Sequence, residues 1–294
     1  MTLCEPARVD PTTCAHRGGP PLDALAAYTG GVSDHRPAAA PAPSPPVRGG
    51  ADRPLAAGVV LAGGSGSRFG AGINKAFLTL AHRSIASWSL LSMAAVDGIG
   101  PLVFVVRPED RDHAEHTVAR ELGERRVEII GGGATRQESE LQALRHLADR
   151  IESGAVDTVL IHDAARPLVS RGLIATVLRT ARRHGGALPG FHADDIAALA
   201  PSDGADRLAA EQPLGDLIRV QTPQGFRADA LLEAYEAAAR DGFAGTDTAS
   251  CIERYTTTPV QWVRGEAENF KITFAQDLAL ATDVVRAHGL APGR

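Results

Sequence analysis

Residues 56–75 read AAGVVLAGGSGSRFGAGINK, a short apolar run followed directly by a glycine-rich turn. The apolar run is typical of a buried strand. A glycine-rich turn after a strand often lets backbone N–H groups close around a phosphate group. We therefore expect a strand that leads into a phosphate-binding loop.

The loop differs from the two common phosphate-binding motifs. A Walker loop ends in Gly-Lys-Ser/Thr, whereas here Asn74 precedes the lysine and Ala76 follows it. The dinucleotide fingerprint requires a third glycine at the position that Phe69 takes. Two cations, Arg68 and Lys75, are present instead, so the pattern predicts a phosphate site of another type.

Short apolar segments alternate with helical patterns from residue 55 onward. Four segments rich in Val, Ile and Leu are expected to be strands, at residues 56–62, 101–106, 127–132 and 157–163. Helices are expected over residues 84–96, 136–151, 173–184 and 228–242. Apolar strands separated by helices indicate an α/β fold, with a Rossmann-like, mostly parallel sheet that carries helices on both faces.

Polar residues follow these strands, at the edge where parallel sheets carry their binding sites. Lys271, near the C-terminus, is expected on a short apolar strand ahead of a helix that Thr273 caps. The residues that follow the two later strands are Ala134, Thr135, Arg136 and Ser139, and then His162, Asp163, Ala164, Ala165, Arg166 and Pro167. Cations and one carboxylate around a glycine-rich loop suit a nucleoside triphosphate with Mg²⁺, with the carboxylate facing the metal or the ribose.

Each feature also has an ordinary structural explanation. The glycines could form a tight turn, Arg68 and Lys75 could be solvated charges, and Asp163 could cap the following helix. Arg136 is less easily explained, because a cation is not favoured at a helix N-terminus. The co-occurrence of these residues at one expected sheet end favours a binding site.

The composition of the chain narrows the function classes. Its 294 residues carry a net charge of -5, which argues against a general nucleic-acid binder. The three cysteines (Cys4, Cys14 and Cys251) have no metal-ligand spacing and no paired pattern, so a reduced, cytoplasmic setting is expected. No apolar run approaches the roughly 18 residues that span a bilayer, and no membrane partner is expected.

Residues 1–54 differ from the rest, since they contain ten of the 19 prolines. Such a segment buries too little apolar area to offset its ordering entropy. We expect a disordered Pro/Ala-rich extension at residues 1–54 and one folded domain at residues 55–294.

Six motifs occur in a recognisable order: LAGGSGSRFG followed by NK, GGATRQES, VLIHDAARP, VQTPQGF, TDTAS and NFKIT. This set resembles the 2-C-methyl-D-erythritol 4-phosphate cytidylyltransferase family of the non-mevalonate isoprenoid pathway, over residues 55–285. The first motif is shared widely among nucleotidyltransferases, whereas HDAARP, TPQ-x-F and N-x-K-I-T are more specific. The ribitol-5-phosphate cytidylyltransferase family carries nearly the same motifs.

The resemblance implies a fold of the nucleotide-diphospho-sugar transferase type. It also implies an enzyme that transfers CMP from CTP to a sugar-alcohol phosphate and releases pyrophosphate. It implies that Arg68 and Lys75 stabilise the transition state and that Lys271 positions the acceptor phosphate. The nucleotide-binding residues that it implies are Ala62, Gly63, Gly64, Gly66, Ala134, Ser139, Asp163, Ala164, Arg166 and Thr273. It also implies Mg²⁺ held by the triphosphate and by Asp163, and a homodimer paired through a projecting arm at about residues 190–220.

Three positions depart from the family pattern. Asp195 stands where the family has a Thr that contacts the acceptor, and Leu214 stands where it has an Arg that contributes to the acceptor site of the partner subunit. Asn74 replaces the usual Pro before the loop lysine. Two alternatives therefore stay open: a cytidylyltransferase for another polyol phosphate, such as ribitol 5-phosphate, and a nucleotide-binding paralogue without catalysis.

Overall fold

The computed structural model describes residues 54–64, 74–193, 199–201, 208–210, 217–245 and 247–293. Gly66 and Arg68 lie outside these residues, as do Asp195, Leu214 and the extension before residue 54. The predictions for these positions stay predictions.

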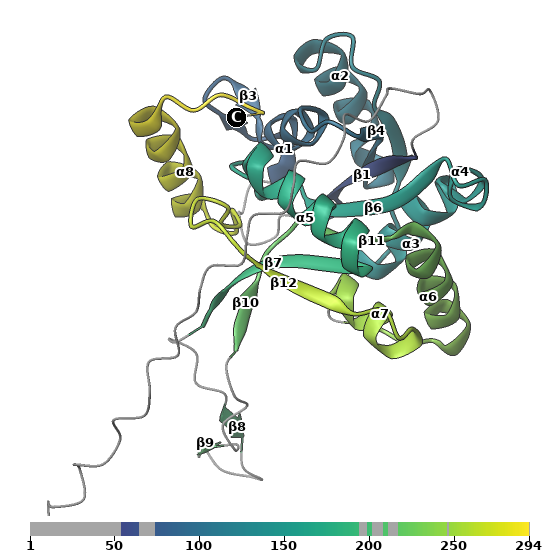
Figure 1. Cartoon of the computed structure of the whole chain (residues 1–294). Helices are drawn as coiled ribbons and strands as arrows, with labels where there is room; N and C mark the ends of the chain where they lie inside the picture. The colour runs from purple at the N-terminus through teal and green to yellow at the C-terminus, as the bar shows by residue number, and fades with distance from the viewer. Residues whose placement is uncertain are drawn as a thin grey trace, which may run out of the picture. The chain divides into compact units, whose positions relative to one another are not determined.

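One sheet organises the described structure (Figure 1). Its strands are β1 (Leu55–Ala62), β4 (Ile99–Val106), β5 (Glu128–Gly131), β6 (Val156–Asp163), β7 (Gly186–His192), β10 (Ile218–Val220), β11 (Gln224–Arg227) and β12 (Val260–Arg264). The order is β10-β7-β11-β6-β1-β4-β5, and β12 pairs with β7. Only β10 and β11 pair antiparallel to their neighbours within this sheet, which confirms the mostly parallel α/β arrangement.

Helices cover both faces of the sheet. One face packs against α1 (Ile85–Ala94), α2 (Arg111–Glu121) and α5 (Arg171–His184). The other packs against α3 (Arg136–His146), α4 (Ala148–Glu152), α6 (Ala228–Asp241) and α7 (Thr248–Tyr255). Strand β1 serves both cores, because successive side chains of a strand point to opposite faces.

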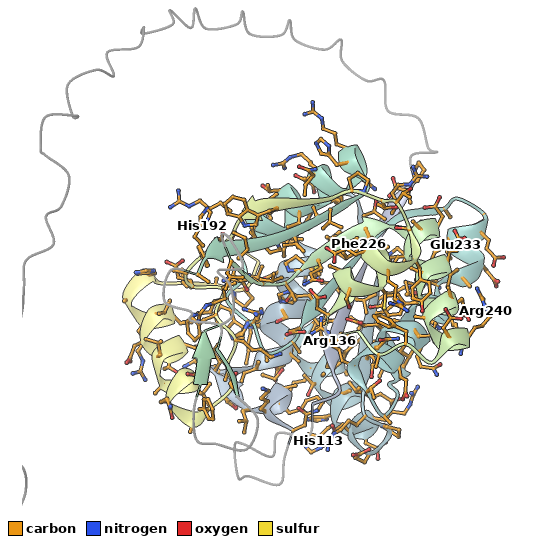
Figure 2. The ribbon with its side chains drawn as sticks, turned by 90° about the horizontal axis from the view of Figure 1, so that it is seen from below. His113, Arg136, His192, Phe226, Glu233 and Arg240 are labelled. Atoms are coloured by element: carbon orange, nitrogen blue, oxygen red, sulfur yellow. The ribbon has the colours of Figure 1, made fainter. Side chains whose placement is uncertain are left out.

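Helix α6 shows how this packing separates apolar from charged side chains. Glu233 and Arg240 lie on its outer side (Figure 2), whereas Leu231 and Tyr235 are buried against Phe226 of β11. Burial of this apolar face, and not helix propensity alone, holds such a helix in place.

Smaller elements complete the fold around the sheet. They are η3 (Lys75–Phe77), η4 (Pro108–Asp110), the pairs β2 (Thr79–Leu80) with β3 (Arg83–Ser84) and β8 (Leu199–Pro201) with β9 (Leu208–Ala210), and α8 (Ala275–His288). Helix α8 closes a third apolar cluster through Ala281 and Val285, which pack with Trp88 of α1. Within the described residues, no helix is long and apolar enough to cross a membrane.

Three local predictions differ from the structure. Lys271 lies on no strand, because its segment crosses the carboxyl end of the sheet and is tied there by the Ile272 N–H, which donates to the Ala165 carbonyl at 2.8 Å. Thr273 does not cap α8, because Asp277 reaches back and accepts from the N–H groups of Thr273 and Phe274 instead. The long helix expected over residues 136–151 is divided at Leu147 into α3 and α4.

Candidate active site

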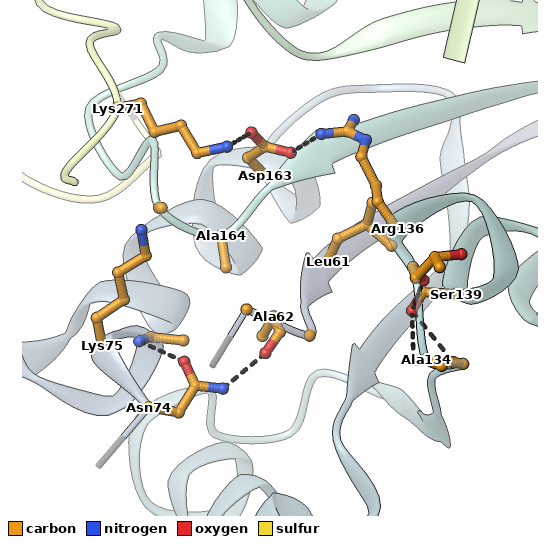
Figure 3. A pocket seen from close by; sticks show the side chains of 16 residues that line it. Leu61, Ala62, Asn74, Lys75, Ala134, Arg136, Ser139, Asp163, Ala164 and Lys271 are labelled. Carbon is orange, nitrogen blue, oxygen red and sulfur yellow. Dashed lines mark hydrogen bonds and ion pairs between the residues drawn. The ribbon is translucent and has the colours of Figure 1, made fainter. Parts of the chain in front are cut away.

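A cavity of about 210 Å³ opens at the carboxyl ends of β1, β5 and β6 (Figure 3). Its lining residues are Leu61, Ala62, Gly63, Gly64, Asn74, Lys75, Ala76, Gly133, Ala134, Thr135, Arg136, Ser139, Asp163, Ala164, Ala165 and Lys271. The sheet brings these segments together because parallel neighbouring strands end at the same edge.

Most of the predicted site residues that the structure describes line this cavity. They are Ala62, Gly63, Gly64, Lys75, Ala134, Ser139, Asp163, Ala164 and Lys271. Arg166 and Thr273 are not among the lining residues. Arg166 instead donates from Nη1 to the Asn269 carbonyl at 2.8 Å, which fastens the segment that leads to Lys271.

Asp163, the last residue of β6, lies between two cations. Its Oδ1 accepts from Nη1 of Arg136 at 2.6 Å, and its Oδ2 accepts from Nζ of Lys271 at 2.8 Å. Burial by itself raises the pKa of this carboxyl, but the charges of Arg136 and Lys271 outweigh burial and hold the pKa well below its usual range. Asp163 is therefore ionised at neutral pH.

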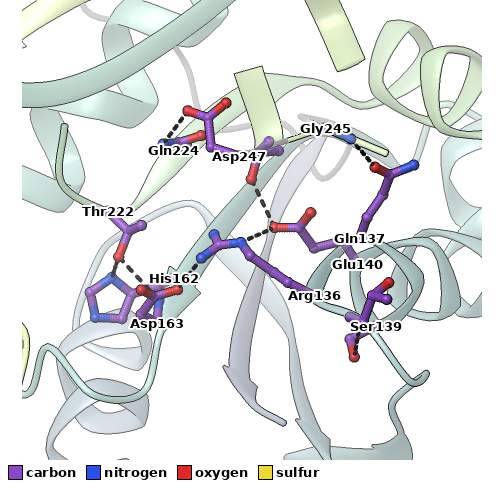
Figure 4. Close-up of polar contacts among 12 residues, drawn as sticks. Arg136, Gln137, Ser139, Glu140, His162, Asp163, Thr222, Gln224, Gly245 and Asp247 are labelled. Atoms are coloured by element: carbon purple, nitrogen blue, oxygen red, sulfur yellow. Dashed lines mark hydrogen bonds and ion pairs between the residues drawn. The ribbon is translucent and has the colours of Figure 1, made fainter. Parts of the chain in front are cut away.

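A second carboxylate lies behind Arg136. Glu140 is 1% exposed and accepts from Nε of Arg136 at 3.0 Å and from the Thr248 hydroxyl at 2.8 Å (Figure 4). The Tyr235 hydroxyl donates to its other oxygen. Burial raises the pKa of Glu140 despite the charge of Arg136. Arg136 thus bridges a buried acid and the acid of the cavity.

The start of α3 forms the wall opposite Lys271. Thr135 caps the helix by accepting from the Glu138 N–H at 3.1 Å, and Glu138 accepts in return from the N–H groups of Ala134 and Thr135. The Ser139 hydroxyl accepts from the Gly133 N–H at 3.1 Å. A Cβ at Gly133 would collide with the Glu138 Cβ, so only glycine allows this close approach.

Both lysines of the chain line the cavity. The 30 basic residues include two lysines, Lys75 and Lys271, and the rest are arginines. Lys75 Nζ donates to the Ile272 carbonyl at 2.9 Å, which places its ammonium group beside the Lys271 segment. A compact ammonium and a planar guanidinium are not interchangeable, and both ammonium groups of the lysine side chains line the cavity.

A buried histidine, His162, is hydrogen-bonded to the residues on either side of the Asp163 segment. The Thr222 hydroxyl accepts from the Asp163 N–H at 3.1 Å, so its own proton is directed to Nδ1 of His162 at 3.0 Å. Nε2 of His162 then donates to the Arg166 carbonyl at 3.1 Å. Burial lowers the pKa of His162 to about 4, so this ring is neutral at physiological pH.

Some residues at the cavity and behind it were assigned no role from the sequence, among them Arg136, Asn74 and Glu140. The sequence places Arg136 among the polar residues that follow the strands, and its unfavourable charge at a helix start was the further signal for a role. Asn74 was noted only as a departure from a motif. Glu140 gave no signal, because its burial depends on Tyr235 and Thr248, which come from other helices.

A divalent metal bound through a nucleotide fits the residues present. No group of three or more His, Cys, Asp or Glu side chains in the described part of the chain is placed to hold a metal ion. A Mg²⁺ ion held by substrate phosphates requires only one or two carboxylates. Asp163 is ionised and lines the cavity, so it supplies one such carboxylate.

The chain is similar to proteins of one family over nearly all of its described length. A family model described as 2-C-methyl-D-erythritol 4-phosphate cytidylyltransferase matches residues 56–287. The enzyme of that name from Thermobifida fusca is 36% identical over 238 residues, which cover 80% of this chain and 94% of the relative. The bifunctional enzyme IspD/IspF from Dinoroseobacter shibae is 37% identical over 79% of this chain, which spans 54% of that longer protein.

A solved structure agrees with this similarity. The 2-C-methyl-D-erythritol 4-phosphate cytidylyltransferase from Thermus thermophilus is 33% identical, with a TM-score of 0.56, and the match covers 78% of this chain and 98% of that chain. The likeness therefore extends to sequence and fold together.

Proposed function

The chain belongs to the 2-C-methyl-D-erythritol 4-phosphate cytidylyltransferase family, and on this basis we propose how its cavity carries out the family's reaction. The enzyme transfers CMP from CTP to 2-C-methyl-D-erythritol 4-phosphate in isoprenoid synthesis and releases pyrophosphate. The observation that supports our assignment of the site is that both lysines of the chain and the ionised Asp163 line one cavity beside Gly63 and Gly64.

The reaction requires stabilisation of negative charge more than covalent help from the protein. The acceptor phosphate attacks the α-phosphorus of CTP, and pyrophosphate leaves on the opposite side. Charge on the phosphoryl oxygens is then stabilised by cations that are already in place. We assign this role to Lys75, together with Arg68, which lies outside the described residues.

Lys271 is assigned to the acceptor phosphate. In the structure, its ammonium group is paired with Asp163 at 2.8 Å. The Lys271 ammonium group has two further N–H donors for a phosphate, and Asp163 keeps its bond to Arg136 at 2.6 Å if Lys271 leaves it for the substrate. Asp163 therefore stays ionised and directed into the cavity when the lysine turns to the substrate.

The nucleotide is assigned to the wall between β1 and α3. Gly63 and Gly64 follow β1 at the cavity, and Ala134 and Ser139 line the side that the family motif associates with cytosine. Nη2 of Arg136 is buried without a hydrogen-bond partner among the described residues. This donor is suited to an acceptor atom of the nucleotide, because a buried unpaired N–H is costly.

Two further features are proposals. Asp163 would hold Mg²⁺ together with the triphosphate oxygens, and the ion would neutralise charge on the phosphates. A homodimer would form through the region of residues 190–220, where the described part shows β7 pairing antiparallel with β10 and β8 with β9. Sedimentation of the full chain measures its mass in solution, and a mass twice that of the chain is expected for the dimer.

The test of the site is pyrophosphate release from CTP and Mg²⁺. The parent enzyme is expected to react with 2-C-methyl-D-erythritol 4-phosphate, and release only with ribitol 5-phosphate would contradict the assigned acceptor. Lys271→Ala is expected to raise the KM for the acceptor more than the KM for CTP. Arg179→Ala removes an exposed cation of α5 that does not line the cavity, and it should change neither constant.

A further inference from the structure

Asn74 is buried at the point where the described chain resumes after the glycine-rich segment. The residue is 2% exposed. Its Nδ2 donates to the Ala62 carbonyl at 2.6 Å and to Oδ2 of Asp110 at 2.8 Å (Figure 3 shows the bond to Ala62). Its Oδ1 accepts from the Ala76 N–H at 3.1 Å, which caps η3. One amide group therefore makes three hydrogen bonds, each to a different segment or turn.

The bond to Ala62 joins the two ends of the glycine-rich segment. Ala62 is the last residue of β1, and Asn74 follows it by 12 positions. A connection across this gap fixes where the chain returns, and with it the backbone position of the next residue, Lys75. The Lys75 side chain then reaches the Ile272 carbonyl at 2.9 Å.

The bond to Asp110 ties the same amide to the segment that follows a second strand, β4. Asp110 belongs to η4, which follows the end of β4. Arg107 holds its carboxylate with two hydrogen bonds, at 2.6 and 2.9 Å. Asp110 is therefore a fixed acceptor, and Asn74 is anchored to the ends of β1 and β4 together.

The backbone of Asn74 has φ -61° and ψ 123°. These angles lie in the region that proline adopts, since its ring fixes φ near -65°. The chain reaches a proline-like backbone here with an asparagine whose side chain supplies the restraint that a ring would supply covalently.

We propose that Asn74 is a positioning residue for cytidylyl transfer, and that it acts through Lys75 by closing the base of the glycine-rich segment. The inference rests on the proposed function of Lys75. Loss of the amide leaves Lys75 chemically intact but allows its ammonium group to move, and a displacement of about 1 Å at a reacting centre lowers rates by up to about a hundredfold.

A double-mutant cycle tests this dependence on Lys75. Asn74→Ala is expected to lower kcat for pyrophosphate release by about 10- to 100-fold with a smaller change in the KM for CTP. In a Lys75→Ala background, the same change should lower kcat by less than about twofold, because the group that it positions is absent. An equal loss in both backgrounds would overturn the proposal.

The matched control is Ser84→Ala. The Ser84 hydroxyl is buried and caps α1 by accepting from the Ser87 N–H at 3.2 Å, and Ser84 does not line the cavity. Both variants are expected to lower Tm by about 2 to 6 °C. Only Asn74→Ala should lower kcat, so a similar kcat loss in Ser84→Ala would show that lost stability alone explains the effect and would overturn the proposal.

A second measurement needs no activity. Reductive ¹³C-methylation labels the α-amino group and the two lysines, so the protein gives one assignable signal for each lysine. Asn74→Ala is expected to shift or broaden the Lys75 signal and leave the Lys271 signal in place. An unchanged Lys75 signal would overturn the proposal, whereas an inactive parent enzyme would contradict the proposed function and leave this readout valid.

Discussion

The buried contact of Glu140 gives the sharpest prediction for stability. Replacement by Ala removes the acceptor of three donors: Nε of Arg136, the Thr248 hydroxyl and the Tyr235 hydroxyl. A buried donor that loses its acceptor costs about 1–3 kcal/mol. Arg136 keeps Asp163 as its second partner at 2.6 Å, so its charge is not left uncompensated, and the expected cost is that of three donors at the low end of this range.

We expect Glu140→Ala to lower the free energy of unfolding by about 4 kcal/mol, equivalent to about 8 to 16 °C in Tm for a domain of this size. Glu140→Gln should cost less, because it retains one acceptor oxygen and because burial already disfavours the charge of Glu140. Urea unfolding followed by circular dichroism measures both values.

Glu236 provides the matched control. Its two oxygens accept from Nε and Nη2 of Arg145 at 2.7 and 2.9 Å, but the pair is exposed to solvent. An exposed pair contributes about 0–1 kcal/mol. If Glu140→Ala costs no more than Glu236→Ala, the buried cluster does not stabilise the fold in the way that we infer.

Other predictions concern the cavity, the pH dependence and the extension. Lys75→Ala should lower turnover by about a hundredfold or more, and near-normal turnover would refute its assigned role. Saturating CTP should slow the reaction of both lysines with an amine reagent, and peptide mapping measures the rate at each lysine. Unchanged rates would place the nucleotide elsewhere. The folded-state pKa of His162 is lowered to about 4, so between about pH 6.5 and 4 the unfolded chain binds a proton that the folded chain does not. The free energy of unfolding should therefore fall by about 3 kcal/mol as the pH falls through this range. His162→Gln should make the free energy of unfolding less dependent on pH in this range. Deletion of residues 1–50 should leave activity and Tm unchanged, and a large loss would show that the extension belongs to the fold.

Local patterns were sufficient for four of the eight strands of the sheet, β1, β4, β5 and β6, and for the position of the site. The strands at residues 56–62, 101–106 and 157–163 could be predicted because continuous apolar runs are buried on both faces of a parallel sheet. The prediction for residues 127–132 matches β5, which begins one residue later and ends one residue earlier. Polar residues after these strands indicated one sheet edge, and the cavity lies there.

Other elements could not be predicted from local patterns. The segment of Lys271 has strand-like composition but joins no strand, since the Ile272 N–H, Nη1 of Arg166 and Nζ of Lys75 hold it across the sheet end. Strands β10 and β11 run against the others, and nothing in their short sequences specifies direction.

The sequence by itself determined the apolar periods, the glycine turn and the order in which polar residues follow the strands, because these depend on neighbours a few positions away. Only the tertiary structure decided the partners of those residues. Lys271 and Asp163 are 108 positions apart, Tyr235 and Glu140 are 95 apart, and Asn74 and Asp110 are 36 apart. Charge pairing and burial act through space, so the ionised Asp163, the buried Glu140 and the anchored Lys75 exist only once the sheet has brought distant segments to one edge.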